Sequence, residues 1–403
     1  MPYKTEEEGL TFVPVSPHCQ DTERIGQCHR KVTANGRENG TGTVLLRGVV
    51  VNRESALAEC GVDICAAGLP EFFLHCLFCD KILPIRVPDL PLNPMTTFET
   101  RLMRVGDWNE VARLIHSSLN IWYERNRGFR LVSDGWETML LFPRVYEALD
   151  PGCCVLVEET ASKRIAGACF FHPRSTHVAL GNMNTHPDFF GHGVASQMLR
   201  YIIDEADRRK LPVRLVSAAT NVDSFSLYNR AGFVPTRFFQ DMTVNVPEEG
   251  FDPDVPAGWT LRDATAEDIP QIVALEKELS SIEREKDYHF FLRNNDNIWH
   301  MSVLTGPNGE LGGFLVSIND PGNNMLGPGL ARDETLAAAL IRGELNFYRG
   351  YSPVWLVPSC ARTLVDAMYT IGARNCELHI TQVLGDYVPE TGIMLPTAMP
   401  GTG

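Results

Sequence analysis

The stretch NTHPDFFGHGVASQML (184–199) contains the residue types of an anion-binding turn. Gly191 and Gly193 lie between an expected strand end and an expected helix start, and without side chains they leave backbone N–H groups uncovered. The first turn of the helix adds unpaired N–H donors and a partial positive charge. We therefore expect residues 190–196 to hold a phosphate group without Lys or Arg. A plain tight turn is the alternative for this stretch alone, because Gly-x-Gly before a helix is a weak signal. The turn also lacks the third glycine and the downstream acidic residue of a dinucleotide-binding fingerprint.

A second stretch, AATNVDSFSLYNRAGF (218–233), follows the helix expected after this turn. A strand should end at Asn221, and the next helix carries Tyr228 shortly before Gly232 and Phe233. The Tyr228 phenol could donate a proton to a basic leaving group, and positioned proton transfer accelerates reactions roughly 100- to 10,000-fold. The alternative is an aromatic residue that packs its helix against a sheet.

Together the two stretches resemble the signature of the GNAT superfamily of acyl-CoA-dependent N-acyltransferases. Its first part is Gln/Arg-x-x-Gly-x-Gly/Ala, and residues 190–195 (FGHGVA) match the last two defining positions. Phe190 stands where Gln or Arg is usual, which removes one polar side chain near the pyrophosphate. Residues 221–233 look like the family's Asn…Leu-Tyr-x-x-x-Gly-Phe element. The resemblance covers about residues 100–246 by motif and 259–382 by the order of elements alone.

The resemblance implies a role for each matching residue, with acetyl-CoA as co-substrate. The backbone groups that would face the acyl carbonyl and the pantetheine arm belong to Asn184, Thr185 and His186. The residues that would hold the pyrophosphate are Phe190, Gly191, His192, Gly193, Val194, Ala195 and Ser196. Asn221 and Ser224 would line the pantetheine channel, and Tyr228 would protonate the leaving thiolate.

The general base, which takes a proton from the acceptor ammonium, has several candidates. The strand expected to carry it, ALGNMNTH (179–186), has no Asp or Glu. His186 is the nearest titratable side chain, and the ordinary pKa of histidine suits the task. Glu158, Glu159 and a water relay are the alternatives.

The segment 117–136 separates the first two helices, where the resemblance places acceptor selection. Its aromatic and cationic residues are Trp122, Tyr123, Arg125, Arg127, Phe129, Arg130 and Trp136. Such residues suit a ligand with an acidic group, and a connector that covers the core is the alternative. The expected acceptor is a small amine or a peptide amine, and the sequence does not distinguish an amino acid from an antibiotic or a peptide N-terminus.

Hydrophobic periodicity predicts an α/β (α+β) unit over 95–246. The expected strands are 101–105, 153–159, 164–171, 176–184, 213–219 and 240–246. The expected helices are one capped by Asp107, one over 137–150 bent before Pro143, and those over 195–210 and 222–231. Each unit should be a mixed, mostly antiparallel sheet flanked by helices.

After a linker (247–258), the same order of elements recurs over 259–390, before a tail (391–403). We expect this second GNAT-like unit to be degenerate and non-catalytic. Gly327 and Gly329 belong to a strand end, Pro328 removes a donor, and Asp333 would oppose a phosphate at the helix start. Tyr369 takes the place that corresponds to Tyr228.

Residues 1–94 lack a sustained period and read as an irregular or disordered extension, with a small genuine domain as the alternative. Four cysteines, Cys60, Cys65, Cys76 and Cys79, with His75 nearby, could bind zinc, but their spacing matches a zinc ribbon poorly. We therefore expect no metal site and unliganded cysteines. The opening residues, MPYKTEEEGL, do not resemble a secretory signal.

The composition of the 403 residues, 44% hydrophobic and 21% charged, is typical of a soluble globular protein. A formal net charge of -14 argues against nucleic acid as the main partner. No apolar run approaches the roughly 20 residues of a membrane-spanning helix, so we expect a cytoplasmic protein without a membrane partner.

These observations predict an N-acetyltransferase that moves an acetyl group from acetyl-CoA to a primary amine by direct attack in a ternary complex. None of the cysteines has the context of a nucleophile, which argues against a covalent acyl-enzyme. The alternative is a non-catalytic acyl-CoA-binding regulatory or scaffold protein, favoured by Phe190 and by the missing carboxylate.

Overall fold

The computed structural model describes residues 96–397 and Met399 with their side chains. It also describes the backbones of five short strands in the preceding segment: β1 (Glu38–Asn39), β2 (Thr43–Val44), β3 (Asp63–Cys65), β4 (Phe72–Cys76) and β5 (Lys81–Ile85). β1 pairs with β2, while β3, β4 and β5 form a separate antiparallel sheet. The chain divides into two compact units, Met1–Pro94 and Met95–Gly403, and the larger unit carries all the motifs of interest.

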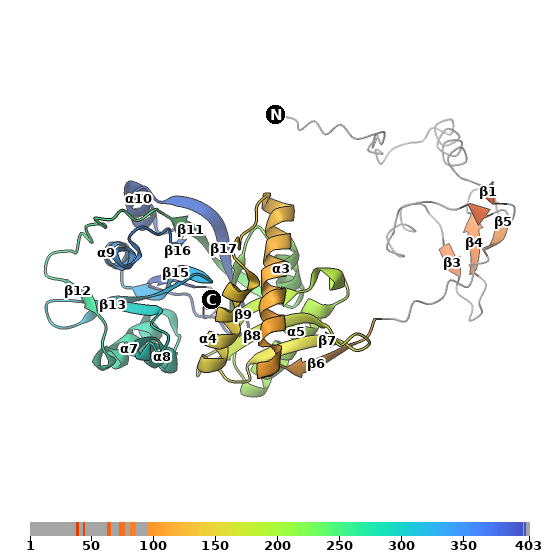
Figure 1. Cartoon of the computed structure of the whole chain (residues 1–403), viewed down its shortest axis with the longest axis horizontal. Coiled ribbons are helices and arrows are strands. Elements are labelled where there is room, and N and C mark those ends of the chain that lie inside the picture. Colours follow the sequence, from red (N-terminus) through yellow and green to blue (C-terminus); the bar gives the residue numbers. More distant parts are fainter. Residues whose placement is uncertain are drawn as a thin grey trace, which may run out of the picture. The chain divides into compact units, whose positions relative to one another are not determined.

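The first half of the larger unit alternates strands and helices in the predicted order (Figure 1). Its strands are β6 (Phe98–Leu102), β7 (Cys154–Glu159), β8 (Ile165–Pro173), β9 (Val178–Thr185), β10 (Val213–Ala218) and β11 (Val234–Thr243). Its helices are α3 (Trp108–Arg127), α4 (Leu141–Leu149), α5 (Val194–Arg209) and α6 (Val222–Arg230), with 3-10 turns η1 (Val105–Asp107), η2 (Trp136–Leu140) and η3 (Pro187–Phe189). The bend predicted before Pro143 is the junction of η2 and α4.

The second half follows the same order. Its strands are β12 (Thr260–Asp263), β13 (Trp299–Thr305), β14 (Leu311–Asp320), β15 (Asn323–Ala331), β16 (Val354–Pro358), β17 (Arg374–Leu384) and β18 (Ile393–Leu395). Its helices are α7 (Ile269–Ser280), α8 (Glu285–Arg293), α9 (Glu334–Leu345) and α10 (Arg362–Thr370), with the turns η4 (Ala266–Asp268) and η5 (Asn346–Tyr348).

One ion pair shows the internal repeat at the level of atoms. In the first half, Arg101 donates to both carboxylate oxygens of Asp107, at 2.7 and 3.0 Å. In the second half, Arg262 makes the same bidentate pair with Asp268, at 2.8 and 2.7 Å. Each aspartate also accepts a backbone N–H three residues earlier, which fixes the turn between the first strand and the first helix.

The two halves exchange their last long strands within one 13-stranded sheet. β17 of the second half lies between β10 and β11 of the first, and β11 in turn pairs with β16 of the second half. All three of these pairings are antiparallel. Figure 1 shows β11 and β17 in the middle of the unit, between the two sets of helices.

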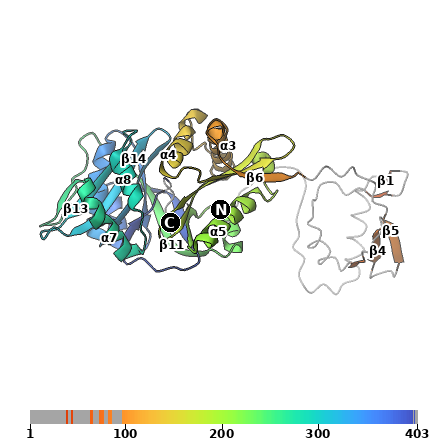
Figure 2. The same cartoon turned by 90° about the horizontal axis from the view of Figure 1, so that it is seen from below.

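Helices cover both faces of this sheet (Figure 2). Alternate residues of β8 show the division, because Ala168 and Phe170 share a hydrophobic cluster with α3 and α4, whereas Cys169 and Phe171 share one with α5 and α6. The α3 face also carries α7 and α8 of the second half. The two faces of the sheet are therefore covered by different helices.

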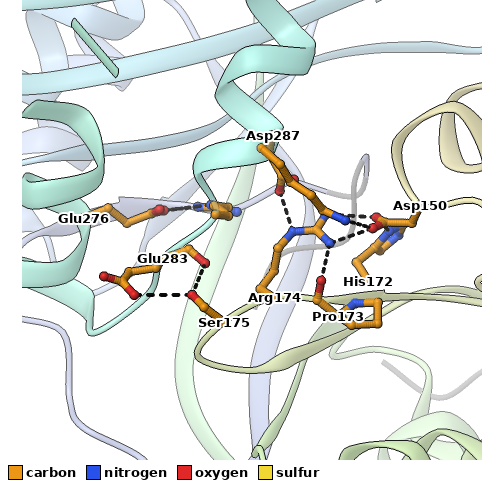
Figure 3. Close-up of polar contacts among 10 residues, drawn as sticks. Asp150, His172, Pro173, Arg174, Ser175, Glu276, Glu283 and Asp287 are labelled. Carbon is orange, nitrogen blue, oxygen red and sulfur yellow. Dashed lines mark hydrogen bonds and ion pairs between the residues drawn. The ribbon is translucent and has the colours of Figure 1, made fainter. Parts of the chain in front are cut away.

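A buried charge network joins the halves on the α3 face (Figure 3). Arg174, in the β8–β9 turn, donates to both oxygens of Asp150 at 3.0 Å and to Asp287 of α8 at 2.9 Å. His172 of β8 contacts the same Asp150 carboxylate at 2.7 Å. The side chains of Arg174, Asp150 and Asp287 are at most 3% exposed, so each buried charge depends on its partners.

Three local predictions were wrong. The first strand is Phe98–Leu102 rather than 101–105, and β11 starts at Val234 rather than at 240. Asp107 precedes α3, but its carboxylate binds Arg101 and the Arg104 amide instead of capping the helix. α8 and β18 were not anticipated at all.

No helix among the residues with described placement is long and apolar enough to cross a membrane.

Replacing Arg174 by Ala should destabilise the protein by about 3–5 kcal/mol, because two buried carboxylates lose their common cation. Denaturant unfolding of the full chain measures the change. Arg362→Ala is the control, since Arg362 pairs with Asp366 at 2.8 Å on the surface and should have no measurable effect. Equal effects of the two substitutions would contradict the structural role of the network.

Cutting the chain between the two halves should not separate them, because β11 and β17 are each paired with strands of the other half. A short protease recognition sequence can be inserted between the exposed residues Ala257 and Gly258. After cleavage we expect the fragments to co-elute in native size-exclusion chromatography and to separate only in denaturant. Separation in native buffer would be incompatible with the strand exchange.

Candidate functional site

The sheet of the first half opens between β9 and β10. These parallel strands are paired only at Val178 with Val213 and at Ala179 with Arg214. Beyond that point β10 continues along β17, as far as the pairing of Ala218 with His379. Residues 180–185 of β9 therefore have a strand partner on the β8 side alone, and their other edge faces the opening.

The glycine turn lies next to this opening and ends where α5 begins. Gly191 and Gly193 have φ angles of 78° and 80°, the left-handed region that glycine adopts without strain. A Cβ on either glycine would meet no heavy atom within 4 Å. Gly193 precedes Val194 without a side-chain cap, so the first N–H groups of α5 are uncovered. The predicted phosphate cradle has the open space and the donors that a pyrophosphate requires.

The side chains around the cradle contribute little to it. Phe190 is 44% exposed and lends no polar group. His192 turns its Nδ1 to the Phe190 carbonyl at 3.0 Å. Ala195 is half-buried and Ser196 is exposed on the first turn of α5. Anion binding here would depend on the backbone.

Tyr228 is held by the turn that ends α6. Gly232 has a φ of 97°, which lets the Phe233 N–H donate to the Tyr228 carbonyl at 3.1 Å. The turn packs the Phe233 ring against the Tyr228 ring, with centroids 5.8 Å apart. Burial raises the pKa of Tyr228, and the Cys169 thiol of β8 adds to the rise. Both effects favour the protonated form of the phenol.

Asn221 and Ser224 are bound to each other at the start of α6. The Asn221 side chain accepts the Ser224 N–H at 3.1 Å and so caps the helix. The cap fixes the helix that carries Tyr228 directly after β10. Asn184, on β9, accepts a hydrogen bond from Ser118 of α3 at 2.6 Å. The Asn184 and Thr185 backbones pair with β8, and the His186 N–H donates to Ala166 at 2.8 Å.

The three side chains considered as general bases are occupied elsewhere. The His186 ring accepts the Asp188 N–H at 3.2 Å, and burial lowers the pKa of His186. Glu158 lies on β7, two strands from the opening, and pairs with Arg101 at 3.0 Å. Glu159 bonds to Ser162 in the β7–β8 turn.

On the opposite face, α3 crosses the opening and contacts both of its sides. On one side, Ser118 donates a hydrogen bond to Asn184 of β9. On the other, Tyr123 and Arg127 donate to Glu377 of β17 at 2.5 and 3.0 Å. Thr220, just after β10, donates to the same Glu377 carboxylate at 2.8 Å. Of the arginines in 117–136, Arg127 is thus neutralised by Glu377, and Arg130 pairs with Glu124 at 3.1 Å.

One polar pair on this face was missed by the sequence reasoning. His379 of β17 contacts Asp241 of β11 through its Nδ1, at 2.8 Å. The two residues are 138 positions apart and come from the two exchanged strands. No local motif marks either residue, and only the strand pairing brings them together.

The second half has a corresponding opening, which the chain itself fills. β15 and β16 are paired only at Met325 with Val354, but β18 pairs with β15 from Gly329 to Ala331. At the start of α9, the Asp333 carboxylate caps the N–H groups of Thr335 and Leu336, both at 2.9 Å. The site where an acyl-CoA would bind is thus closed at both the strand opening and the helix start. The Tyr369 hydroxyl bonds to Gln240 at 2.8 Å.

Among the residues whose side chains are described, no cluster of three or more His, Cys, Asp or Glu could hold a metal ion. The four cysteines considered for zinc, and His75, lie where no side chains are described.

Part of the first half matches the model of a known protein family. The family model described as "Acetyltransferase (GNAT) family" matches residues 117–233, a span that includes the glycine turn and Tyr228. A search of curated proteins found no match.

Two solved structures show the same fold over both halves. A putative acetyltransferase from Pyrococcus horikoshii is 14% identical, with 74% of this chain and 94% of that chain covered and a TM-score of 0.57. A GCN5-related N-acetyltransferase from Sphaerobacter thermophilus is 18% identical, with 73% and 98% covered and a TM-score of 0.52. At these identities the likeness establishes the fold. Residues 117–233 therefore match the GNAT acetyltransferase family model, and both halves together have the fold of these two acetyltransferase structures.

Proposed function

We propose that this protein is an N-acetyltransferase that transfers an acetyl group from acetyl-CoA to a primary amine. The observation that carries the proposal is the combination, in one half only, of an open strand pair, an uncovered glycine cradle and a buried tyrosine. A pyrophosphate at residues 190–196 would direct the pantetheine arm along the open edge of β9. The thioester would then lie between β9 and β10, near Tyr228.

The reaction is a direct attack in a ternary complex. The amine nitrogen attacks the carbonyl carbon of the thioester, the C–S bond breaks, and Tyr228 donates its proton to the departing sulfur. The described cysteines of the first half are poorly suited to form an acyl-enzyme, because burial raises the pKa of the Cys153, Cys154 and Cys169 thiols and disfavours the nucleophilic thiolate.

A non-catalytic acyl-CoA-binding module is the second candidate, favoured by the exposed Phe190 and by a β9 strand without Asp or Glu. Such a module would bind acetyl-CoA and never release free CoA thiol. Thiol release over a panel of primary amines therefore separates the two functions.

Gly193→Ala should weaken acetyl-CoA binding by at least roughly tenfold, about 1.4 kcal/mol, because the new methyl group would cover the amide donors. Calorimetric titration of the full chain measures the affinity, and one molecule should bind per chain, since the second opening is filled. Gly309→Ala is the matched control, because Gly309 has the same φ of 80° and the same open space but lies in the β13–β14 turn. If both substitutions weaken binding equally, the cradle is not at Gly193.

Tyr228→Phe should lower kcat by about 100- to 10,000-fold and leave the KM for acetyl-CoA nearly unchanged, because the substitution removes only the proton donor. Tyr369→Phe, at the corresponding place in the second half, should retain full activity. Steady-state assays of CoA thiol release at several pH values provide the comparison. Full activity of the Tyr228→Phe variant at every pH would exclude Tyr228 as the acid.

A further inference from the structure

The proposed reaction needs a base on the acceptor side, and the three side chains considered for it in the first half are engaged elsewhere. Two further polar side chains near the opening are engaged as well. Asn184 accepts from Ser118, and Glu377 accepts from Tyr123, Arg127 and Thr220.

His379 lies beside the opening, on the α3 face. Its partner across the ladder is Ala218, the last residue of β10, where β10 has diverged from β9. His379 and Glu377 are two residues apart in β17, so their side chains point to the same face. Because Glu377 contacts α3 on that face, His379 points into the region between α3 and the sheet. The phosphate cradle and Tyr228 belong to the opposite face.

The contact with Asp241 fixes which nitrogen of His379 can accept a proton. A carboxylate only accepts, so the imidazole Nδ1 donates to Asp241 and the Nε2 of the neutral ring carries the free lone pair. Among the described residues, Nε2 has no hydrogen-bond partner, and the side chain is 22% exposed. Burial raises the pKa of Asp241, and the hydrogen bond from His379 opposes that rise. The groups around the dyad include Tyr123 and Arg127 of α3, Glu377 of β17, and the Cys376 thiol, which donates to the Asp241 carbonyl at 3.3 Å.

We propose that His379, oriented by Asp241, is the general base of the first half's reaction, so that the second half supplies a catalytic residue to the first. The acceptor amine enters on the α3 face, opposite to the acetyl-CoA. The acceptor ammonium first gives one proton to Nε2 of His379, which frees the nitrogen lone pair for attack. As the N–C bond forms and the C–S bond breaks, Tyr228 protonates the sulfur and is reprotonated by the second proton that the nitrogen loses. His379 releases its proton to solvent. Asp241 is a positioning residue, and the inference rests on the proposed function.

Bromoacetyl-CoA tests the position of His379 without requiring a known acceptor. If Nε2 faces the acyl group, it should displace bromide and form a covalent N–C bond, which peptide mass spectrometry would locate at His379. The labelling should be blocked by excess acetyl-CoA and absent from the His379→Gln variant. Tight binding of bromoacetyl-CoA without a His379 adduct would overturn the proposal.

Kinetic variants test the role of the base. His379→Gln should lower kcat about 100- to 10,000-fold at neutral pH, with little change in the KM for acetyl-CoA. The loss should shrink as the pH approaches the pKa of the acceptor amine, because a free amine needs no base. Asp241→Asn should cause a smaller loss with an altered pH profile.

His300→Gln is the matched control. His300 contacts Glu344 through Nδ1 at the same 2.8 Å and is 23% exposed, but it lies in the second half on β13. It should retain full activity. If His379→Gln turns over as fast as wild type, the base assignment fails while the acyltransferase function stands. If wild type binds acetyl-CoA but releases no thiol with any amine, both proposals fail.

Discussion

The antiparallel pairing of β11 with β17 is the constraint on which the rest of this structure depends. Each strand completes the sheet of the half that does not encode it, so neither half has a full sheet by itself. The buried network around Arg174 adds a second connection, in which one cation satisfies a carboxylate from each half. The two halves are separate in sequence and interdependent in structure.

This dependence gives a physical reason for the second unit, which we expect to bind no acetyl-CoA, to persist beside the first. The groups expected to bind acetyl-CoA all come from the first half, from the glycine turn to Tyr228. The acceptor side of the proposed site includes β17. There, Glu377 accepts hydrogen bonds from Tyr123 and Arg127 of α3. Under the proposed function, the second unit therefore supplies β17 to the acceptor side of the first unit's site.

The parts of the site that are local in sequence could be predicted from the sequence. The turn at Gly191 and Gly193, the following helix and the position of Tyr228 depend on neighbouring residues, and the order of elements followed from hydrophobic periodicity. The start of β11 was missed because Pro235 cannot donate to a ladder and argues against a strand, whereas the structure accommodates it next to a register shift. The contact of His379 with Asp241 joins residues 138 positions apart and depends on a register that no local pattern encodes.

β18 limits how the second half could acquire an open strand edge like that of the first half. Its three residues occupy the edge of β15 where the first half leaves its own edge free. Substitutions that introduced a glycine turn and removed Asp333 would rebuild a cradle beside an edge that is still covered. An open edge of β15 in this half therefore requires a different path of the segment after β17, because substitutions at the helix start would leave β18 in place.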